Sequence, residues 1–279
     1  MIKEAKTMTK TILITGSTDG IGLETAKLLV SEGHRVLLHG RNPTKLEAAA
    51  KSLSDLPGSV ASYVADLSRM ADVGSLAQAV AKNHPTLDVL INNAGVLKTP
   101  NTVTPDGLDV RFAVNAIAPY LLTQQLRPLM TASGRIINVS SAAQSPVNLE
   151  ALAGRVQLTE DFTAYAQSKL ALTMWSRSLA LSPLGDGLTI IAVNPGSMLG
   201  SKMVKEGFGV AGGDLRIGAD ILTRAALTDE FAAASGQYFD NDKGQFASPH
   251  PDALDPQKCQ KVVEAIETCL VDRGSDLFW

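Results

Sequence analysis

Short apolar runs alternate with longer amphipathic stretches along most of this 279-residue chain. The runs are apolar at consecutive positions, as in strands that are covered on both faces of a sheet. They span residues 11–15, 35–39, 60–64, 89–92, 135–140, 189–194 and 237–239. Stretches of helical period lie between them, at residues 21–31, 44–53, 70–82, 108–130, 163–181 and 218–227. This alternation predicts an α/β fold with a doubly wound parallel sheet and helices on both faces.

The predicted sheet has about seven strands and is of the Rossmann type. No linker rich in Pro, Ser or Gly divides the alternation and no internal repeat is present, so we expect one domain over residues 1–279. Residues 1–10 are too polar for a secretory signal and are predicted to be a flexible leader. No apolar run approaches the roughly 20 residues that span a bilayer, so we expect a cytoplasmic protein without a membrane span.

Composition and charge narrow the function classes. The content of 45% hydrophobic and 19% charged residues is that of an ordinary globular protein, and a net charge of −3 gives no sign of nucleic-acid binding. Cys259 and Cys269 are ten positions apart in an apparent C-terminal helix, which predicts neither a disulfide nor a zinc site. Four histidines lack ligand spacing, so we expect no metal site and mostly surface or loop positions for them: His34, His39, His84 and His250.

A glycine-spaced turn follows the first predicted strand and opens the first predicted helix. Gly16, Gly20 and Gly22 would let the backbone approach a pyrophosphate at the positive end of the helix dipole. A tight turn without any ligand would use the same glycines, and their spacing is looser than that of the usual dinucleotide motif. The glycines alone therefore leave both readings open.

The end of the second predicted strand bears on the choice of dinucleotide. It reads Gly40-Arg41-Asn42, without a carboxylate to bind a ribose 2′-hydroxyl. The planar fork of Arg41 suits a 2′-phosphate, which favours NADP(H) over NAD(H), although Arg41 could be an ordinary solvated arginine. Asp19 in the glycine turn would weaken attraction for a phosphate, so NAD(H) remains the alternative cofactor.

Tyr165 and Lys169 lie four residues apart in a predicted helix, so their side chains share one face. A phenol with a pKa of about 10 is a poor acid or base at neutral pH. A fixed cation nearby favours the phenolate and is expected to lower that pKa. The pair therefore predicts proton transfer at Tyr165, in an oxidoreductase.

Several motifs, in order, resemble those of the short-chain dehydrogenase/reductase family over nearly the whole chain. They are Thr15-Gly-x-x-x-Gly-Ile-Gly22, Asp66-Leu67, Asn92-Asn-Ala-Gly95, Asn115, Asn138-Val-Ser-Ser141, Tyr165-x-x-x-Lys169 and Asn194-Pro-Gly196. The resemblance implies that Tyr165 exchanges a proton with the substrate oxygen, while Lys169 lowers its pKa and holds the nicotinamide ribose. It implies that Ser141, with Ser140 as the alternative, hydrogen-bonds that oxygen. Asn115 would hold a water of a proton relay, or else cap a neighbouring backbone group.

The resemblance also implies a set of cofactor contacts. Asp66 and Leu67 would lie near the adenine, although Asp66 could instead be a helix N-cap. Pro195 to Met198 would lie against the nicotinamide amide. The full predicted set is Gly16, Ser17, Thr18, Asp19, Gly20, Ile21, Arg41, Asn42, Asp66, Leu67, Asn93, Ala94, Gly95, Tyr165, Lys169, Pro195, Gly196 and Met198.

The chain departs from the commonest family pattern in two places. Ser141 and Tyr165 are 24 positions apart, so about a dozen extra residues lie within 144–162, as in the retinol dehydrogenase-like branch. The role of this insertion is open. A threonine often found four positions after the Pro-Gly glycine is missing here, where Gly200 and Ser201 stand. Glycines interspersed with Met and Phe predict a mobile substrate lid at residues 197–215, with a plain surface loop as the alternative.

The preferred hypothesis is an NADP(H)-dependent oxidoreductase that interconverts a partly apolar carbonyl and a secondary or primary alcohol. The alternatives are a catalytically silent regulatory or scaffold protein that binds the cofactor, and an NAD(H)-preferring dehydrogenase. Residues 108–130 and 165–181 carry more apolar positions than one sheet face needs. This favours either a homo-oligomer interface or packing within the chain. Substrate identity and reaction direction are left open.

Overall fold

The computed structural model describes residues 8–185 and 187–275. Its strands form one sheet in the order β3-β2-β1-β4-β5-β6-β7-β8, in which every neighbouring pair is parallel except β7 with β8. The strands are β1 (Thr11–Ile14), β2 (Arg35–Gly40), β3 (Ser59–Val64), β4 (Leu87–Asn92), β5 (Met130–Val139), β6 (Thr189–Asn194), β7 (Tyr238–Asp240) and β8 (Gln245–Ala247). The doubly wound parallel sheet is confirmed, and β8 adds one short antiparallel strand that the sequence pattern did not predict.

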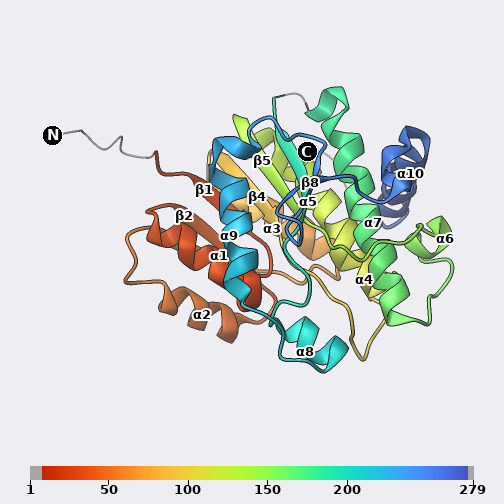
Figure 1. Ribbon diagram of the computed structural model, residues 1–279, viewed down its shortest axis with the longest axis horizontal. Coiled ribbons are helices and arrows are strands. Elements are labelled where there is room, and N and C mark those ends of the chain that lie inside the picture. The colour runs from red at the N-terminus through yellow and green to blue at the C-terminus, as the bar shows by residue number, and fades with distance from the viewer. Residues whose placement is uncertain (1–7, 186, 276–279) are drawn as a thin grey trace.

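Helices cover both faces of the sheet (Figure 1). Alternate residues of one strand point to opposite faces, so Ile12 and Ile14 pack in one core while Leu13 packs in the other. The first core lies under α1 (Gly20–Ser31), α2 (Pro43–Ser52) and α9 (Leu215–Leu227). The second lies under α3 (Met70–Asn83), α5 (Ala118–Leu126) and α7 (Asp161–Ala180). This two-sided burial explains why the strands are apolar at consecutive positions.

The helix predicted for residues 108–130 is observed from Val110 to Leu129, but it is irregular, and Met130 already begins β5. It consists of α4 (Val110–Phe112), a π-helical turn (Ala113–Ile117), α5 and a 3-10 turn (Arg127–Leu129). Pro119 has no N–H and cannot donate to the carbonyl of Asn115 four residues earlier. Arg127 keeps helical dihedral angles (φ −52°, ψ −40°) although it precedes Pro128, and the chain continues from α5 into the 3-10 turn.

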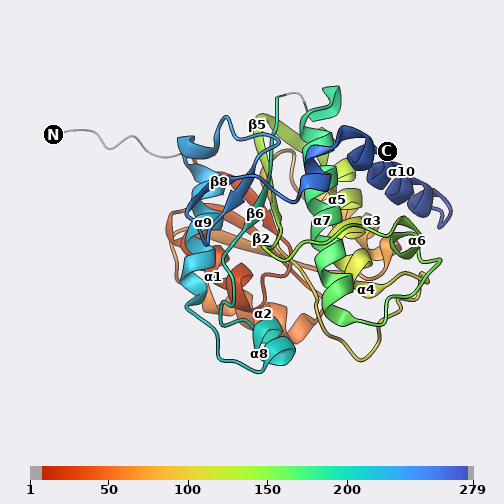
Figure 2. The same ribbon diagram turned by 45° about the vertical axis from the view of Figure 1, so that its right-hand side comes forward.

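The C-terminal helix α10 (Pro256–Val271) packs across α7, on the side of α7 away from the sheet (Figure 2). Cys259 and Cys269 are both free and both buried in this contact. The hydroxyl of Tyr120, in α5, donates to the Glu267 carboxylate of α10. The apolar surplus of the two long predicted helices is therefore covered within the chain, while the oligomeric state stays a prediction.

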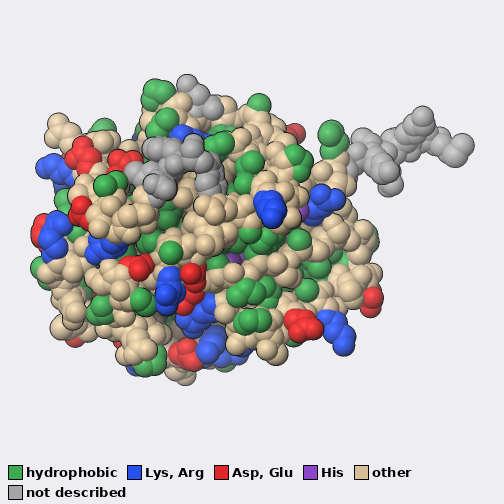
Figure 3. Space-filling model, turned by 180° about the vertical axis from the view of Figure 1, so that it is seen from behind, with side chains coloured by type: hydrophobic (Ala, Val, Ile, Leu, Met, Phe, Trp, Pro, Cys, Tyr) green, Lys and Arg blue, Asp and Glu red, His purple; other side chains and the backbone are tan. Residues whose placement is uncertain are grey.

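The remaining elements are short. They are α6 (Leu149–Leu152), α8 (Lys202–Phe208) and 3-10 turns at Pro183–Gly185, Asp229–Phe231 and Pro251–Leu254. Among the described helices, none is both long and apolar enough to cross a bilayer. Acidic and basic side chains are interspersed over the face seen in Figure 3. The predicted leader falls largely on residues 1–7, which lie outside the described residues.

Candidate active site

The turn between β1 and α1 brings backbone close to backbone. Gly16 has φ +65°, and a Cβ there would lie 2.9 Å from Ala94 Cα. A Cβ on Gly22 would lie 2.3 Å from the Gly16 oxygen. Asp19 stands at the N-cap of α1 but its side chain makes no capping hydrogen bond. The first-turn amides therefore carry the positive end of the helix dipole without a capping carboxylate on them, and this donor set fits the pyrophosphate of a dinucleotide.

The end of β4 braces this turn. Asn93 Nδ2 donates to the carbonyls of Thr15 at 2.9 Å and Gly16 at 3.0 Å. The Thr15 hydroxyl in turn accepts the amides of Asn93 at 3.0 Å and Ala94 at 3.1 Å. The side chain of Asn93 is thus committed to the turn, and residues 93–95 line it from the neighbouring strand.

Three predicted cofactor residues direct their side chains into the protein. The hydroxyl of Ser17 is buried and accepts the His39 amide at 2.9 Å. Ile21 packs against Gly218 of α9, and Leu67 lies in the core under α3. A cofactor would therefore contact these residues mainly through their backbones. Residue type alone could not predict this.

The end of β2 gathers charges at the surface. Arg41 is exposed, and Asn42 caps α2 by accepting the Lys45 amide at 3.0 Å. The Lys45 ammonium lies 3.7 Å from the Asp19 carboxylate. This exposed ion pair is weak. It nevertheless places a positive charge beside Asp19, the carboxylate that would weaken attraction for a phosphate. Sequence reasoning missed Lys45, although its position three residues after Asn42, a residue type that favours helix N-caps, was visible.

Two further predicted contacts have clear local roles. Asp66 accepts the Ser68 amide at 3.0 Å, in a turn that precedes α3. The N-cap of α3 is Arg69, so the alternative reading of Asp66 as the cap is wrong. Thr18 packs against the end of β2, where a Cβ on Gly40 would be 2.4 Å from the Thr18 methyl group, so a larger residue there would require the Thr18 side chain to move.

Tyr165 and Lys169 lie together on α7, with Lys169 Nζ 5.7 Å from the centroid of the Tyr165 ring. The ammonium donates to the Val139 carbonyl, at the end of β5, at 2.6 Å. Burial lowers the pKa of Lys169 to about 8. Burial also raises the pKa of Tyr165, while a hydrogen bond with Ser141 acts in the opposite direction. The expected lowering of the Tyr165 pKa is therefore not found: desolvation outweighs the hydrogen bond with Ser141, and the phenol holds its proton.

The two serines after β5 face different ways. Ser140 is buried, and its hydroxyl lies 2.7 Å from the Thr173 hydroxyl on α7. Ser141 is half-buried, and its side chain interacts with Tyr165. Its carbonyl accepts the Tyr238 hydroxyl at 3.0 Å. The geometry favours Ser141 over Ser140, and it adds Tyr238, which the sequence analysis missed, as a support from β7.

Asn115 lies in the π-helical turn and is buried. Its Nδ2 donates to the Val96 carbonyl and to the Ser168 hydroxyl, both at 2.9 Å. Its Oδ1 accepts the Val96 amide at 2.8 Å. The Ser168 hydroxyl in turn donates a hydrogen bond to the Tyr165 carbonyl at 2.7 Å. The side chain thus holds a neighbouring backbone, as the alternative reading expected, and π-helical turns are frequent at functional sites.

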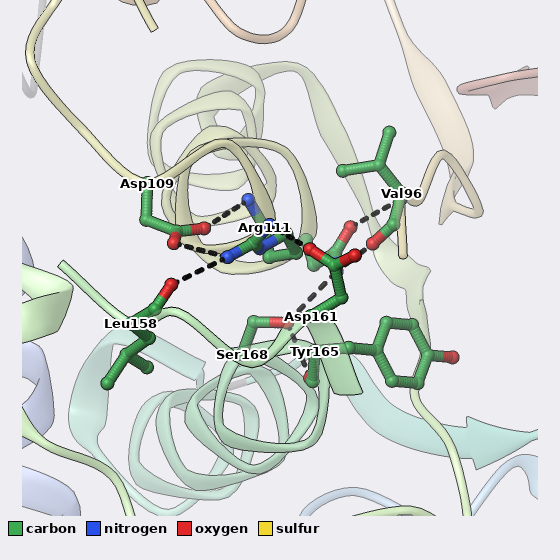
Figure 4. A network of polar contacts seen from close by, with 8 residues as sticks. Val96, Asp109, Arg111, Leu158, Asp161, Tyr165 and Ser168 are labelled. Carbon is green, nitrogen blue, oxygen red and sulfur yellow. Dashed lines mark hydrogen bonds and ion pairs between the residues drawn. The ribbon is translucent and has the colours of Figure 1, made fainter. Parts of the chain in front are cut away.

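A buried cation joins the same two helices one turn earlier (Figure 4). The fully buried Arg111 donates to Asp109 and to Asp161, each at 2.8 Å, and to the Leu158 carbonyl at 3.3 Å. Arg111 precedes Asn115 by four residues, and Asp161 precedes Tyr165 by four. The ion pair and the Asn115–Ser168 contact therefore form two successive bridges between the helices that carry the site.

The loop after β6 is held by the turn between β7 and β8. Asp242 accepts the Ser197 amide at 2.7 Å and the Asn194 side-chain amide at 2.9 Å. Asn241 Nδ2 donates to the Pro195 carbonyl at 2.9 Å. None of these supports had a recognisable sequence motif, because the turn is about 45 residues away along the chain.

The segment predicted as a lid begins with strained backbone and contains a helix. Met198 is a non-glycine residue with φ +54°. Its carbonyl accepts the Gly213 amide at 2.8 Å, so the two ends of the segment are joined. On α8 between them, Met203 Cε lies 3.5 Å from where a Cβ on Gly95 would be, and Phe208 meets Phe162 with ring centroids 6.2 Å apart. The segment therefore reaches from Gly95, after β4, to Phe162 at the end of the insertion.

Comparison with known proteins gives consistent results. A family model described as short chain dehydrogenase matches residues 10–209. Human retinol dehydrogenase 13 is 31% identical over 273 residues, covering 91% of this chain and 82% of that protein. The crystal structure of an uncharacterised Mycobacterium paratuberculosis protein has a TM-score of 0.79 at 27% identity, over 96% of this chain and 94% of that chain. The landomycin C-6 ketoreductase LanV, with bound NADP and rabelomycin, has a TM-score of 0.65 at 30% identity, over 83% and 94% respectively.

Replacing Arg111 with Met should destabilise the protein strongly. The change leaves the buried Asp109 carboxylate without its cation, and breaking a buried pair in this way costs about 3–5 kcal/mol. Urea unfolding measures the loss. The control is Arg155→Met, which breaks the exposed pair with Glu150 and should leave the unfolding midpoint nearly unchanged. Equal midpoints for the two variants would contradict the role given to Arg111.

Proposed function

Because the chain belongs to the short-chain dehydrogenase family, we propose that it is an NADP(H)-dependent enzyme that reduces partly apolar carbonyl compounds. Interconversion of a carbonyl and an alcohol follows from the family and its retinol dehydrogenase and ketoreductase relatives. The observation that carries the finer proposal is the grouping of Tyr165, Lys169 and Ser141 at the carboxyl end of the sheet. Ligands of doubly wound sheets bind at this edge.

A bound NADPH would supply the hydride that adds to the carbonyl carbon. Tyr165 gives its phenol proton to the carbonyl oxygen as negative charge develops there. Ser141 donates a hydrogen bond to the same oxygen and holds it within reach of Tyr165. The raised pKa of Tyr165 keeps the phenol protonated at neutral pH, which suits the direction of carbonyl reduction.

Lys169 has two functions in this proposal. Its ammonium faces the developing phenolate and stabilises that charge as the proton leaves. It also returns a proton to Tyr165 after the reaction, through a relay that includes a water beside Asn115. Pro119 cannot donate to the Asn115 carbonyl, so this oxygen is suited to hold a relay water, while the Asn115 side chain fixes Val96 and Ser168.

The cofactor preference rests on the end of β2. Arg41 offers a fork of donors to a 2′-phosphate, and Lys45 adds a second cation that offsets Asp19. Two solved relatives, LanV and a metagenomic short-chain oxidoreductase, contain NADP. These features support NADP(H) as the cofactor, with NAD(H) as the alternative.

The substrate enters beside the lid, residues 197–215. The lid turns Met203 toward Gly95 and Phe208 toward Phe162, so its inner side is largely apolar. Met and Phe adapt to apolar ligands of different shapes. This supports substrates with an apolar body, and retinol, after which several relatives are named, is one such alcohol.

Tyr165→Phe should lower turnover of carbonyl substrates by about 10²–10⁴-fold, because the substrate oxygen loses its proton donor. NADPH oxidation is followed by absorbance against a panel of aldehydes and ketones that includes all-trans-retinal. NADPH affinity should stay nearly unchanged. The control Tyr63→Phe removes a hydroxyl that pairs with His84 away from the site, and should keep full activity. Retained activity in Tyr165→Phe would refute the proton-transfer role.

The rate of carbonyl reduction should fall as the pH rises through about 8. Below this pH Lys169 is an ammonium, and above it the side chain becomes neutral and no longer stabilises the phenolate. The pKa of Tyr165 is raised, so loss of the phenol proton comes later. The measurement is kcat/KM between about pH 6 and 10. Lys169→Met should be slow throughout and lack the fall near 8; a wild-type profile that stays flat would count against the assignment.

Arg41→Ala should weaken NADPH binding by about tenfold or more and leave NADH binding nearly unchanged, since only NADPH carries the 2′-phosphate. Calorimetric titration with both cofactors measures this. Lys45→Ala is expected to act in the same direction. Lys51→Ala, in the exposed last turn of α2, is the control for net charge. Equal losses of NADPH and NADH affinity in Arg41→Ala would argue for the NAD(H) alternative.

A further inference from the structure

His39 is a buried residue near the end of β2, and it connects two other strand ends. Its Nδ1 accepts the Gly16 amide at 3.1 Å, from the turn after β1. Its Nε2 lies 3.2 Å from the Ala65 carbonyl, directly after β3. Only a neutral ring with its proton on Nε2 satisfies both contacts, since Nδ1 must accept while Nε2 donates. His39, which lies within a strand, is the exception to the expectation that the histidines occupy mostly surface or loop positions.

The surroundings of His39 favour the neutral ring. Burial lowers its pKa to about 4, although the Ala65 carbonyl and the nearby Asp66 charge act against this shift. A protonated ring would point Nδ1–H at the Gly16 amide, so two donors would face each other. At neutral pH the ring is therefore a fixed bridge between β1, β2 and β3.

The groups that the bridge holds all belong to one half of the candidate cofactor site. Gly16 opens the turn proposed to bind the pyrophosphate, and Ala94 lies too close to it for a residue with a Cβ. Ala65 precedes Asp66, which is proposed to lie near the adenine. The Ser17 hydroxyl, from the same turn, accepts the His39 amide. Tyr165 and Lys169 lie three strands away in the sheet order, at β5.

We propose that His39 is a positioning residue for the adenosine half of the dinucleotide, which it serves by joining the turns after β1 and β3. This inference rests on the proposed function, because it requires that NADP(H) binds at this edge. It goes beyond that function in assigning a residue that touches neither substrate nor reacting atoms. Loss of the bridge should weaken binding of the adenosine half and leave the chemical step at saturating cofactor nearly unchanged.

The chain offers a matched control at the other end of the same strand. His34 is also buried, and its Nδ1 accepts a backbone amide, that of Lys10, at 3.2 Å. It directly precedes β2, at the amino edge of the sheet and away from the candidate site. His34→Leu and His39→Leu both remove a buried ring that accepts one backbone amide, so a purely structural role would make them alike.

Binding of NADPH and of adenosine 2′,5′-bisphosphate, which is the adenosine half alone, is measured by calorimetry for the wild type and each variant. His39→Leu should raise both dissociation constants by about tenfold, as expected for loss of an ordering hydrogen bond. His34→Leu should leave both constants unchanged. His39→Asn places an oxygen near the Nδ1 position and should recover most of the affinity, whereas His39→Gln, whose polar atoms reach the Nε2 position, should recover less.

The outcomes are distinct. If His39→Leu binds both probes as tightly as His34→Leu, the positioning role fails. If His39→Leu does not fold, the comparison of His39→Asn with His39→Gln decides, and equal affinities of those two variants overturn the proposal. If the wild type binds neither probe, the proposed NADP(H) function itself fails. A fall in kcat at saturating NADPH as large as the loss of affinity would also overturn the inference, because it would place His39 in the chemical step.

Discussion

The buried ammonium of Lys169 is the constraint around which the site is built. An ammonium taken out of water is costly unless it finds hydrogen-bond acceptors, and here the Val139 carbonyl supplies one at 2.6 Å. That carbonyl is at hand because β5 ends beside α7. The contact therefore depends on where β5 ends, where α7 begins and where Lys169 lies within α7. Tyr165 shares the same face of α7, so whatever fixes the lysine also fixes the phenol.

The fixing comes from side chains that are distant in sequence. Arg111 and Asn115 bridge from one helix to α7, His39 ties the ends of β1, β2 and β3, and Asp242 holds the loop after β6. Each of these contacts satisfies polar groups at the carboxyl edge of the sheet, where backbone ladders stop. A reactive group keeps its geometry only if its neighbours are themselves fixed. The supports thus surround the candidate site.

The sequence predicts the sheet and the grouped residues well, because consecutive apolar positions and fixed motif spacings are local signals. It fails where the decisive neighbour is remote. The burial of His39 depends on Gly16 and Ala65, and the interior position of Ser17 depends in turn on His39. The irregular helix around Asn115 could have been predicted, because Pro119 is visible in the sequence and has no N–H to donate to the Asn115 carbonyl. The raised pKa of Tyr165 could not be predicted, since the spacing indicates a nearby charge but not the burial that raises this pKa.

The insertion between Ser141 and Tyr165 is tied to α7 at two points and to α4 at a third. The Asn148 amide donates to Gln167 at 2.9 Å and the Ser145 amide to the Ala166 carbonyl at 3.4 Å, while the Leu158 carbonyl accepts from Arg111 of α4. The first two ties lie on the residues that follow Tyr165, so the insertion forms a fixed wall beside the phenol. The opposite wall is α8, whose segment is joined to the fold through Met198 and Gly213. Phe162 and Phe208 meet where the two walls approach. On the proposed function, a substrate oxygen that reaches Tyr165 would pass apolar side chains from both walls, so segments remote from the chemistry would select the shape of the substrate.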